Sequence, residues 1–228
     1  YSNEIRKYKI PDGDKKWQLV KKWGKEGEGP GEFNQPSGIC TDGYGNLYVA
    51  DSYNGRIQKF APDGNFIMEI NYSKSGFWRP RNVFAGKGEM IYVANTGKFN
   101  MCQFDKNGRL LYDFVDMKGE IFGITQDKDG FIYAANSGTK TIDILSDYLV
   151  LKRKIKVPAY RQNLELWPML SMDSKQRIYA VSRFEQQIWV YNIENDKNGK
   201  NLKLMGIIKK DKNNQPLFSS PIGIAIDG

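Results

Sequence analysis

Short apolar runs alternate with glycine- and aspartate-rich segments along the whole chain. The clearest example, from Gln35 to Phe66, reads QPSGICTDGYGNLYVADSYNGRIQKFAPDGNF. Its apolar runs are separated by D-G-Y-G-N, D-S-Y-N-G and P-D-G-N, and these residue types tolerate the positive φ that tight hairpin turns require. The pattern therefore predicts a meander of four short antiparallel strands.

This module occurs several times along the chain, with its strands at equivalent positions. The second strand contains a tyrosine and recurs as NLYVADS around Tyr48, MIYVANT around Tyr92, FIYAANS around Tyr133 and RIYAVSR around Tyr179, at spacings of 44, 41 and 46 residues. An apolar segment precedes each copy, and two more follow it. A fixed period of this length indicates a repeat architecture in which each sheet buries its faces against its neighbours.

The second strands predict how these sheets pack. Leu47 and Val49 point to one face of the strand and Tyr48 and Ala50 to the other, yet all four are apolar. A sheet buried on both faces explains this pattern, and sheets stacked around an axis form a β-propeller, which leaves only short edges. We therefore expect an all-β fold built from four-stranded antiparallel blades.

The ends of the chain look like parts of further modules. We expect one domain over residues 1–228, with a partial blade at 1–24, blades at about 31–72, 76–116, 118–157 and 165–210, and a partial blade at 221–228. A first strand at one end and later strands at the other are what a ring closed by its termini would show. The simplest closure has six blades and needs about 270 residues at roughly 45 per blade, so we expect an incomplete ring in this chain.

The segment from Gly24 to Phe66 resembles the NHL repeat. That repeat has the pattern G-x-G-x-G-x-F-x-x-P-x-G-I, then D-x-x-G-x-[IL]-Y-V-x-D, then N-x-R-I-x-x-F and a D-G turn. The resemblance implies a six-bladed NHL-type β-propeller. The other copies depart from it, because Asn95, Asn136 and Ser182 match Asp51, and Asn100, Thr141 and Gln187 match Arg56. The matching residues of the best copy are Gly27, Gly29, Gly31, Phe33, Pro36, Gly38, Ile39, Asp42, Gly45, Tyr48, Val49, Asp51, Asn54, Arg56, Ile57, Phe60, Asp63 and Gly64.

Charge and reactive side chains narrow the function. The net charge is +8, from 34 Lys and Arg against 26 Asp and Glu, which fits either a solvated lysine-rich surface or an anionic partner. Histidine is absent, which excludes His-based acid–base catalysis, the Ser-His-Asp triad and His-containing zinc sites. Cys40 and Cys102 lie in apolar strand patterns without a C-x-x-C motif, so we expect buried free thiols.

The chain begins at Tyr1 rather than Met, so we expect a segment upstream of it, and the N-terminus does not indicate the compartment. No apolar run is long enough for a membrane span. The resemblance to bacterial NHL proteins favours the periplasm or cell surface as the location.

Our main functional prediction is a non-catalytic scaffold that binds a protein partner. In a propeller, the loops entering the first strands and those joining the second and third strands form one face, where recognition residues collect. Exposed aromatic and arginine side chains there are typical of interface hot spots. The candidate binding residues on this face are Arg56, Arg79, Arg81, Asn82, Asn95, Lys98, Phe99, Asn136, Lys140, Arg183 and Phe184.

Two alternatives stay open. Some animal NHL propellers bind single-stranded RNA, and cationic side chains beside Trp78, Phe99 and Phe184 are the mixture that such binding uses. However, Trp78 and Trp167 match positions that pack between blades in the family, so we expect core filling for both.

The second alternative is a calcium-dependent lactonase or esterase, as in related six-bladed hydrolases. Calcium needs six to eight oxygen ligands, and the residues expected to face the channel (Ser37, Asn82, Phe122 and Pro168 or Met169) include no carboxylate. We therefore expect no enzyme activity, no metal and no cofactor. Asp42, Asp127, Asp173 and Asp227 recur at turn positions, so we expect them to form turns.

Overall fold

The computed structural model describes residues 3–9, 16–72, 76–114, 117–157, 169–182, 186–209 and 224. Within them lie four four-stranded antiparallel sheets and one two-stranded sheet. In each four-stranded sheet the strands pair in chain order, as a meander does. The all-β prediction and the four-stranded antiparallel modules are confirmed.

The strands are short except in the last sheet. The two-stranded sheet consists of β1 (Ile5–Lys9) and β2 (Gln18–Trp23). Blade 1 consists of β3 (Pro36–Thr41), β4 (Leu47–Asp51), β5 (Arg56–Phe60) and β6 (Phe66–Ile70). Blade 2 consists of β7 (Asn82–Ala85), β8 (Ile91–Asn95), β9 (Asn100–Phe104) and β10 (Leu110–Phe114).

Blades 3 and 4 continue the series. Blade 3 consists of β11 (Ile121–Gln126), β12 (Ile132–Asn136), β13 (Thr141–Leu145) and β14 (Leu151–Lys156). Blade 4 consists of β15 (Met169–Met172), β16 (Arg177–Ser182), β17 (Gln187–Asp196) and β18 (Gly199–Ile208). Two 3-10 turns, η1 (Lys87–Glu89) and η2 (Thr96–Lys98), join strands within blade 2.

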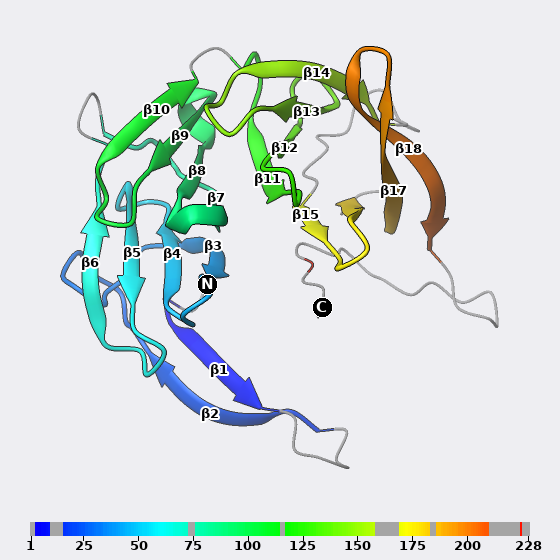
Figure 1. The fold of residues 1–228 in the computed structure, drawn as a ribbon. Coiled ribbons are helices and arrows are strands. Elements are labelled where there is room, and N and C mark those ends of the chain that lie inside the picture. The colour runs from blue at the N-terminus through cyan, green and yellow to red at the C-terminus, as the bar shows by residue number, and fades with distance from the viewer. Residues whose placement is uncertain are drawn as a thin grey trace.

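The sheets stand side by side along an arc, with β3, β7, β11 and β15 innermost and β6, β10, β14 and β18 outermost (Figure 1). The innermost strands approach one another closely. A Cβ atom at Gly38 of β3 would lie 2.6 Å from the Arg81 carbonyl oxygen, so only glycine fits there. The Asn82 side chain of β7 then donates a 2.6 Å hydrogen bond to the Phe122 carbonyl of β11.

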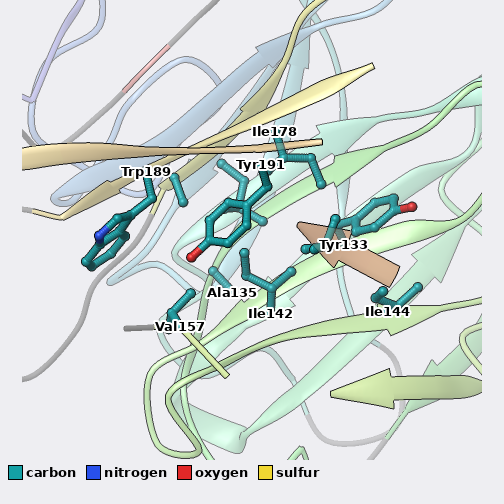
Figure 2. Close-up of a cluster of buried hydrophobic side chains, with 11 residues drawn as sticks. Tyr133, Ala135, Ile142, Ile144, Val157, Ile178, Trp189 and Tyr191 are labelled. Carbon is teal, nitrogen blue, oxygen red and sulfur yellow. The ribbon is translucent and has the colours of Figure 1, made fainter. Parts of the chain in front are cut away.

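The hydrophobic core lies between the blades. All five residues of β8 and of β12 are buried, so both faces of these sheets are covered. Figure 2 shows the cluster between blades 3 and 4, where Ile142 and Ile144 of β13 pack with Trp189 and Tyr191 of β17. Burying one such side chain contributes about 1.5–3 kcal/mol, so contact between neighbouring blades dominates the stability.

Aspartates organise the turns between the first and second strands. The Asp42 carboxylate accepts backbone hydrogen bonds from Tyr44 and Asn46, both at 2.9 Å. Asp127 accepts equivalent bonds from Asp129 and Phe131, and Asp173 accepts one from Arg177. The predicted turn-forming role is confirmed for these three, while Asp227 lies outside the described residues.

Both cysteines lie within the described part of the chain. Cys102 is buried and Cys40 half-buried, and neither forms a disulfide, so the expectation of a buried thiol is met in full by Cys102. Burial raises the pKa of Cys40 to about 12, so it stays protonated and unreactive at neutral pH. Among the described residues, no helix has the length and apolarity that crossing a membrane requires.

Candidate functional site: the loop face

The loops that lead into the innermost strands, together with those joining second and third strands, form one face of the molecule. We call it the loop face. Its described residues are 24–35, 52–55, 76–81, 96–99, 117–120 and 137–140. The tight turns of the other two connections in each blade form the opposite face, which we call the turn face.

In blade 1 the loop face is closed by a charged network around Arg56. The guanidinium is paired with Asp51 and Glu69, each at 2.9 Å, and is only 7% exposed. It also donates to the carbonyls of Gly29 and Glu32 at 2.8 and 3.1 Å. Arg56, one of the predicted binding residues, thus holds the glycine-rich loop against the blade and has little surface left for a partner.

Two predicted asparagines play a similar part in the next blades. Asn95 is fully buried, and its side-chain oxygen accepts a 2.7 Å hydrogen bond from the backbone of Trp78. Asn136 is also buried and donates to the Met117 carbonyl at 2.6 Å. Asp51 accepts the corresponding bond from Asn34 in blade 1. In blades 1 to 3 the last residue of the second strand therefore fixes the loop that enters the same blade.

Aromatic side chains are exposed on the loop face above blades 1 and 2. Trp78 is 60% exposed, Phe99 47% and Tyr53 43%. The Arg79 guanidinium lies 5.0 Å from the centre of the Tyr53 ring, which is a cation–π distance. The expectation that Trp78 fills the core is wrong, because Phe77, one residue earlier, takes the buried position and packs on Phe104.

The backbone presents several of these side chains in a left-handed conformation. Arg79, Phe99, Lys118 and Lys140 have φ values of 49°, 53°, 56° and 57°, although none is glycine. Blade 1 has Gly55 in the position that corresponds to Phe99. A bulky residue in this region is uncommon and costs about 1–3 kcal/mol, and such residues concentrate at functional sites.

The charge on the loop face changes from blade to blade. The glycine-rich loop before blade 1 carries Glu26, Glu28 and Glu32 against Lys25. The described loop-face residues of blades 2 and 3 reverse this balance, with five cations (Arg79, Arg81, Lys98, Lys118 and Lys140) and one carboxylate, Glu120. The second region therefore favours an anionic partner.

Short contacts connect these groups across the blades. A Cβ atom at Gly97 would collide with the Trp78 indole, so that ring lies directly over the 3-10 turn η2. The Phe99 carbonyl accepts a 3.0 Å bond from Met117, which links η2 to the loop entering blade 3. We call this continuous set the aromatic–basic patch: Tyr53, Trp78, Arg79, Lys98, Phe99 and Lys118.

The other predicted residues lie in different surroundings. Asn82 is buried between innermost strands, and the Arg81 carbonyl accepts a 3.0 Å bond from Ser37. Lys98 reaches the Gly76 carbonyl at 2.9 Å. Lys140 lies on the loop face in blade 3. Arg183, Phe184 and Trp167 lie outside the described residues.

Trp78 and Lys118 are missing from the binding residues that the sequence predicts. An alignment of the tripeptides N-Q-P (residues 34–36) and W-R-P (residues 78–80) would have found Trp78. It sets Phe77 opposite the buried Phe33 and Trp78 opposite Asn34, which is half-buried on the loop face. Lys118 has no proline after it, so that signal is missing in blade 3.

Comparison with known proteins agrees with this geometry. The family model of the NHL repeat matches residues 33–60, which run from the buried Phe33 to Phe60. These two rings pack at a centroid distance of 5.8 Å. Residues 33–60 of this chain therefore match the NHL repeat.

Its curated relatives share parts of the chain. Protein lin-41 of Caenorhabditis elegans is 53% identical over 47 residues, 21% of this chain and 4% of that protein. Peptidyl-glycine alpha-amidating monooxygenase A of Xenopus laevis is 28% identical over 159 residues, 60% of this chain and 16% of that protein. The chain thus spans only a small part of the length of either relative.

Solved structures identify the fold of this chain. A streptogramin B lyase structure superposes with a TM-score of 0.68 at 16% sequence identity, covering 98% of this chain and 66% of that one. At this identity the likeness concerns the fold alone. The β-propeller prediction is confirmed.

Proposed function

We propose that this NHL-repeat chain is a non-catalytic scaffold whose aromatic–basic patch binds a protein partner through an acidic, aromatic-tolerant segment. The observation that carries the proposal is the exposure of Trp78 and Phe99 beside a group of cations. Large aromatic side chains and arginine dominate binding energy at protein interfaces. The loops stand on a rigid frame of buried strands, which keeps the cost of ordering them low.

The strained backbone supports the same face. Phe99 adopts a conformation that suits glycine, and its ring points to solvent instead of filling the core. The same left-handed turn position holds Gly55 in blade 1 and Lys140 in blade 3, so the turn itself sets this conformation. A role in recognition accounts for an exposed aromatic ring at a position where blade 1 has glycine.

Single-stranded RNA is the second candidate partner. The stacking of Arg79 on Tyr53 and the exposed Trp78 ring supply the cation and the flat surfaces that bases use. The basic balance of the loops in blades 2 and 3 suits a phosphate backbone equally well. The experiment below separates the two.

The non-catalytic reading is supported by the groups on the innermost strands. Ser37 is bonded to Ser52 and to the Arg81 carbonyl, and Asn82 to the Phe122 carbonyl. The chain has no histidine. Among the described residues, no three His, Cys, Asp or Glu side chains are grouped as metal ligands would be.

Site-specific photo-crosslinking tests the proposal. A benzophenone amino acid replaces Phe99 in one variant and Tyr44 in a matched control, because Tyr44 is 71% exposed on the turn face. After irradiation in an extract of the native cells, we expect a discrete protein adduct from position 99. The adduct should be lost when Trp78→Ala is combined with the probe.

Nuclease treatment gives the discriminating arm. A protein adduct that survives ribonuclease supports protein binding, whereas a ribonuclease-sensitive adduct whose yield falls steeply with salt supports RNA. Equal adducts from positions 44 and 99 would contradict the proposal, because the loop face would then have no advantage over the turn face.

A further inference from the structure

The turn face carries a tyrosine–aspartate pair in three blades, and blade 2 lacks it. The hydroxyls of Tyr48, Tyr133 and Tyr179 donate to Asp42, Asp127 and Asp173 at 3.4, 3.0 and 3.2 Å. The corresponding turn of blade 2 begins at Gly86, whose N–H bonds to the Met90 carbonyl as Asp42 bonds to Asn46. Tyr92, the corresponding tyrosine, therefore has no carboxylate partner in its own turn.

The strand beside Tyr92 has changed as well. In blade 1 the register places Lys59 opposite Tyr48, and the ammonium lies 5.0 Å from the centre of that ring. In blade 2 the same register places Gln103 opposite Tyr92. The cation beside the tyrosine in blade 1 is thus replaced by a neutral amide in blade 2.

This uncharged pair has unused hydrogen-bonding capacity. The Gln103 amide donates to the Tyr92 hydroxyl at 3.3 Å, and the Gln126 side chain is a second hydrogen-bond partner of that hydroxyl. The Gln103 side-chain oxygen has no hydrogen-bond partner among the described residues, although the residue is only 4% exposed. A buried unpaired acceptor is costly in a folded protein and calls for an explanation.

Both side chains line a cavity of about 500 Å³ between blades 2 and 3. Its walls include Met90, Leu111 and the rings of Tyr112 and Tyr148, which meet edge to face at 5.5 Å. The volume lies within the range of small-molecule sites, which combine apolar and aromatic walls with few polar groups.

The rim of the cavity carries no net charge. Lys87 and Lys128 stand beside Asp129 and Asp147. The Lys87 ammonium is already bonded to the Lys128 carbonyl, and Asp129 is paired with Lys200 at 2.6 Å. Burial raises the pKa of Tyr92 to about 12, with a further contribution from Asp147, so its hydroxyl stays a neutral donor at physiological pH.

We propose that this cavity binds a small, uncharged, planar heterocycle whose edge presents a hydrogen-bond acceptor next to a donor. The acceptor takes the Tyr92 hydroxyl proton, and the donor satisfies the Gln103 oxygen. The tyrosine rings cover the faces of the heterocycle. The site lies on the turn face and is separate from the aromatic–basic patch, so the two proposals stand independently.

The lactam 2-quinolinone is a suitable probe, because it places N–H beside C=O on a flat, uncharged ring system. N-methyl-2-quinolinone is the matched control, since it keeps the shape and loses the donor. Binding to the full chain is measured by saturation-transfer NMR and by calorimetry. We expect saturable binding of the lactam and at least about tenfold weaker binding of its N-methyl form, a factor that corresponds to 1.4 kcal/mol.

Two variants and one control test the residues. Gln103→Leu removes the unpaired oxygen, so it should weaken the binding of 2-quinolinone about tenfold or more without lowering Tm. Tyr148→Ala removes a largely exposed wall residue and should also weaken binding, whereas Tyr44→Ala, an exposed turn-face tyrosine of blade 1, should leave it unchanged. No saturable binding up to the solubility limit, or equal affinities for both compounds or across all variants, would overturn the proposal.

Discussion

Blades 1 and 2 are built on the same strand order, yet they fill equivalent buried positions with different chemistry. Where blade 1 pairs Asp51 with Arg56 at 2.9 Å, blade 2 has Asn95 opposite Asn100. Where blade 1 has Asp42 beside Tyr48, blade 2 has Gly86 beside Tyr92. Blade 2 has therefore lost charged partners on both its loop face and its turn face.

The losses leave polar groups without partners. The side-chain nitrogen of Asn95 and the oxygens of Asn100 and Gln103 have no hydrogen-bond partner among the described residues, whereas no side chain of blade 1 is in that state within the same set. The hydrophobic positions are kept, since Phe77 packs on Phe104 as Phe33 packs on Phe60. Packing between blades thus maintains the fold, and the polar positions are free to diverge toward exposed aromatic rings and a cavity.

Breaking the charged network of blade 1 should have the largest effect. Arg56→Ala leaves the Asp51 carboxylate buried without its cation, and we expect it to lower the free energy of unfolding by about 3–5 kcal/mol. The corresponding change in blade 2, Asn100→Ala, removes a neutral side chain that contacts the Cys102 sulfur at 3.6 Å and hydrogen-bonds the Tyr72 hydroxyl, so we expect a loss of only about 1 kcal/mol. Chemical denaturation compares the two, and equal losses would contradict the difference between the blades.

The tyrosine–aspartate pairs should show a smaller contrast. Tyr133→Phe removes a buried 3.0 Å hydrogen bond to Asp127 and should cost about 1.5–3 kcal/mol, because the acceptor is ionised. Tyr92→Phe removes contacts with two neutral amides, Gln103 at 3.3 Å and Gln126, and should cost about 0.5–1.5 kcal/mol. Urea midpoints at unchanged m-value give the comparison. A larger loss of stability for Tyr92→Phe than for Tyr133→Phe would contradict this difference between the blades.

The sequence predicts the repeated part of this molecule well and the divergent part poorly. Strand period, tyrosine spacing and turn residues predict the four-stranded sheets, because side-chain alternation and positive-φ turns are local properties. The glycine-rich loop and Arg56 were visible in the repeat pattern. The burial of Arg56 could not be predicted from that pattern, because it depends on the carbonyls of Gly29 and Glu32, which lie far from Arg56 in the chain.

The site depends on details that a residue pattern does not carry. Trp78 and Phe77 are adjacent aromatic residues, and a shift of one position exchanges the buried ring with the exposed one. The cavity on the turn face lies beside a turn that has Gly86 in place of aspartate, and blade 3 completes its lining with Tyr148 and Gln126. The cavity therefore depends on contacts between repeats, and the sequence of one repeat alone does not predict it.

Lowering the pH should affect the stability of a turn that contains aspartate more than that of the turn in blade 2, which has Gly86 in its place. Burial pushes the pKa of Asp173 upward, but hydrogen bonds from the backbone and side chain of Arg177 outweigh it, so the pKa is lowered. A carboxylate with a depressed folded-state pKa stabilises the protein above its unfolded value of about 3.9 and loses that contribution as pH falls through the folded pKa. We expect Asp173→Asn to flatten the fall in Tm between about pH 5 and pH 2.

The matched control for this pH series is Gly86→Ala in blade 2, where no carboxylate exists. It should leave the slope of Tm against pH unchanged, although crowding against Gln126 and Tyr92 at 2.7 Å lowers Tm itself. An Asp173→Asn slope identical to that of the unmodified chain would show that this turn contributes nothing to acid unfolding.

The smallest expected change in stability concerns the left-handed residue of the aromatic–basic patch. Phe99→Gly gives blade 2 the residue that blade 1 has at Gly55, and glycine adopts a φ near 53° without strain. Since the Phe99 ring is about half exposed, little packing is lost, and we expect the free energy of unfolding to rise by up to about 1 kcal/mol. The same variant should lose most of its affinity for the partner captured by crosslinking. If the strained Phe99 ring contributes to binding, its removal must weaken the affinity for the partner. Greater stability with undiminished affinity would therefore show that Phe99 has no role in recognition.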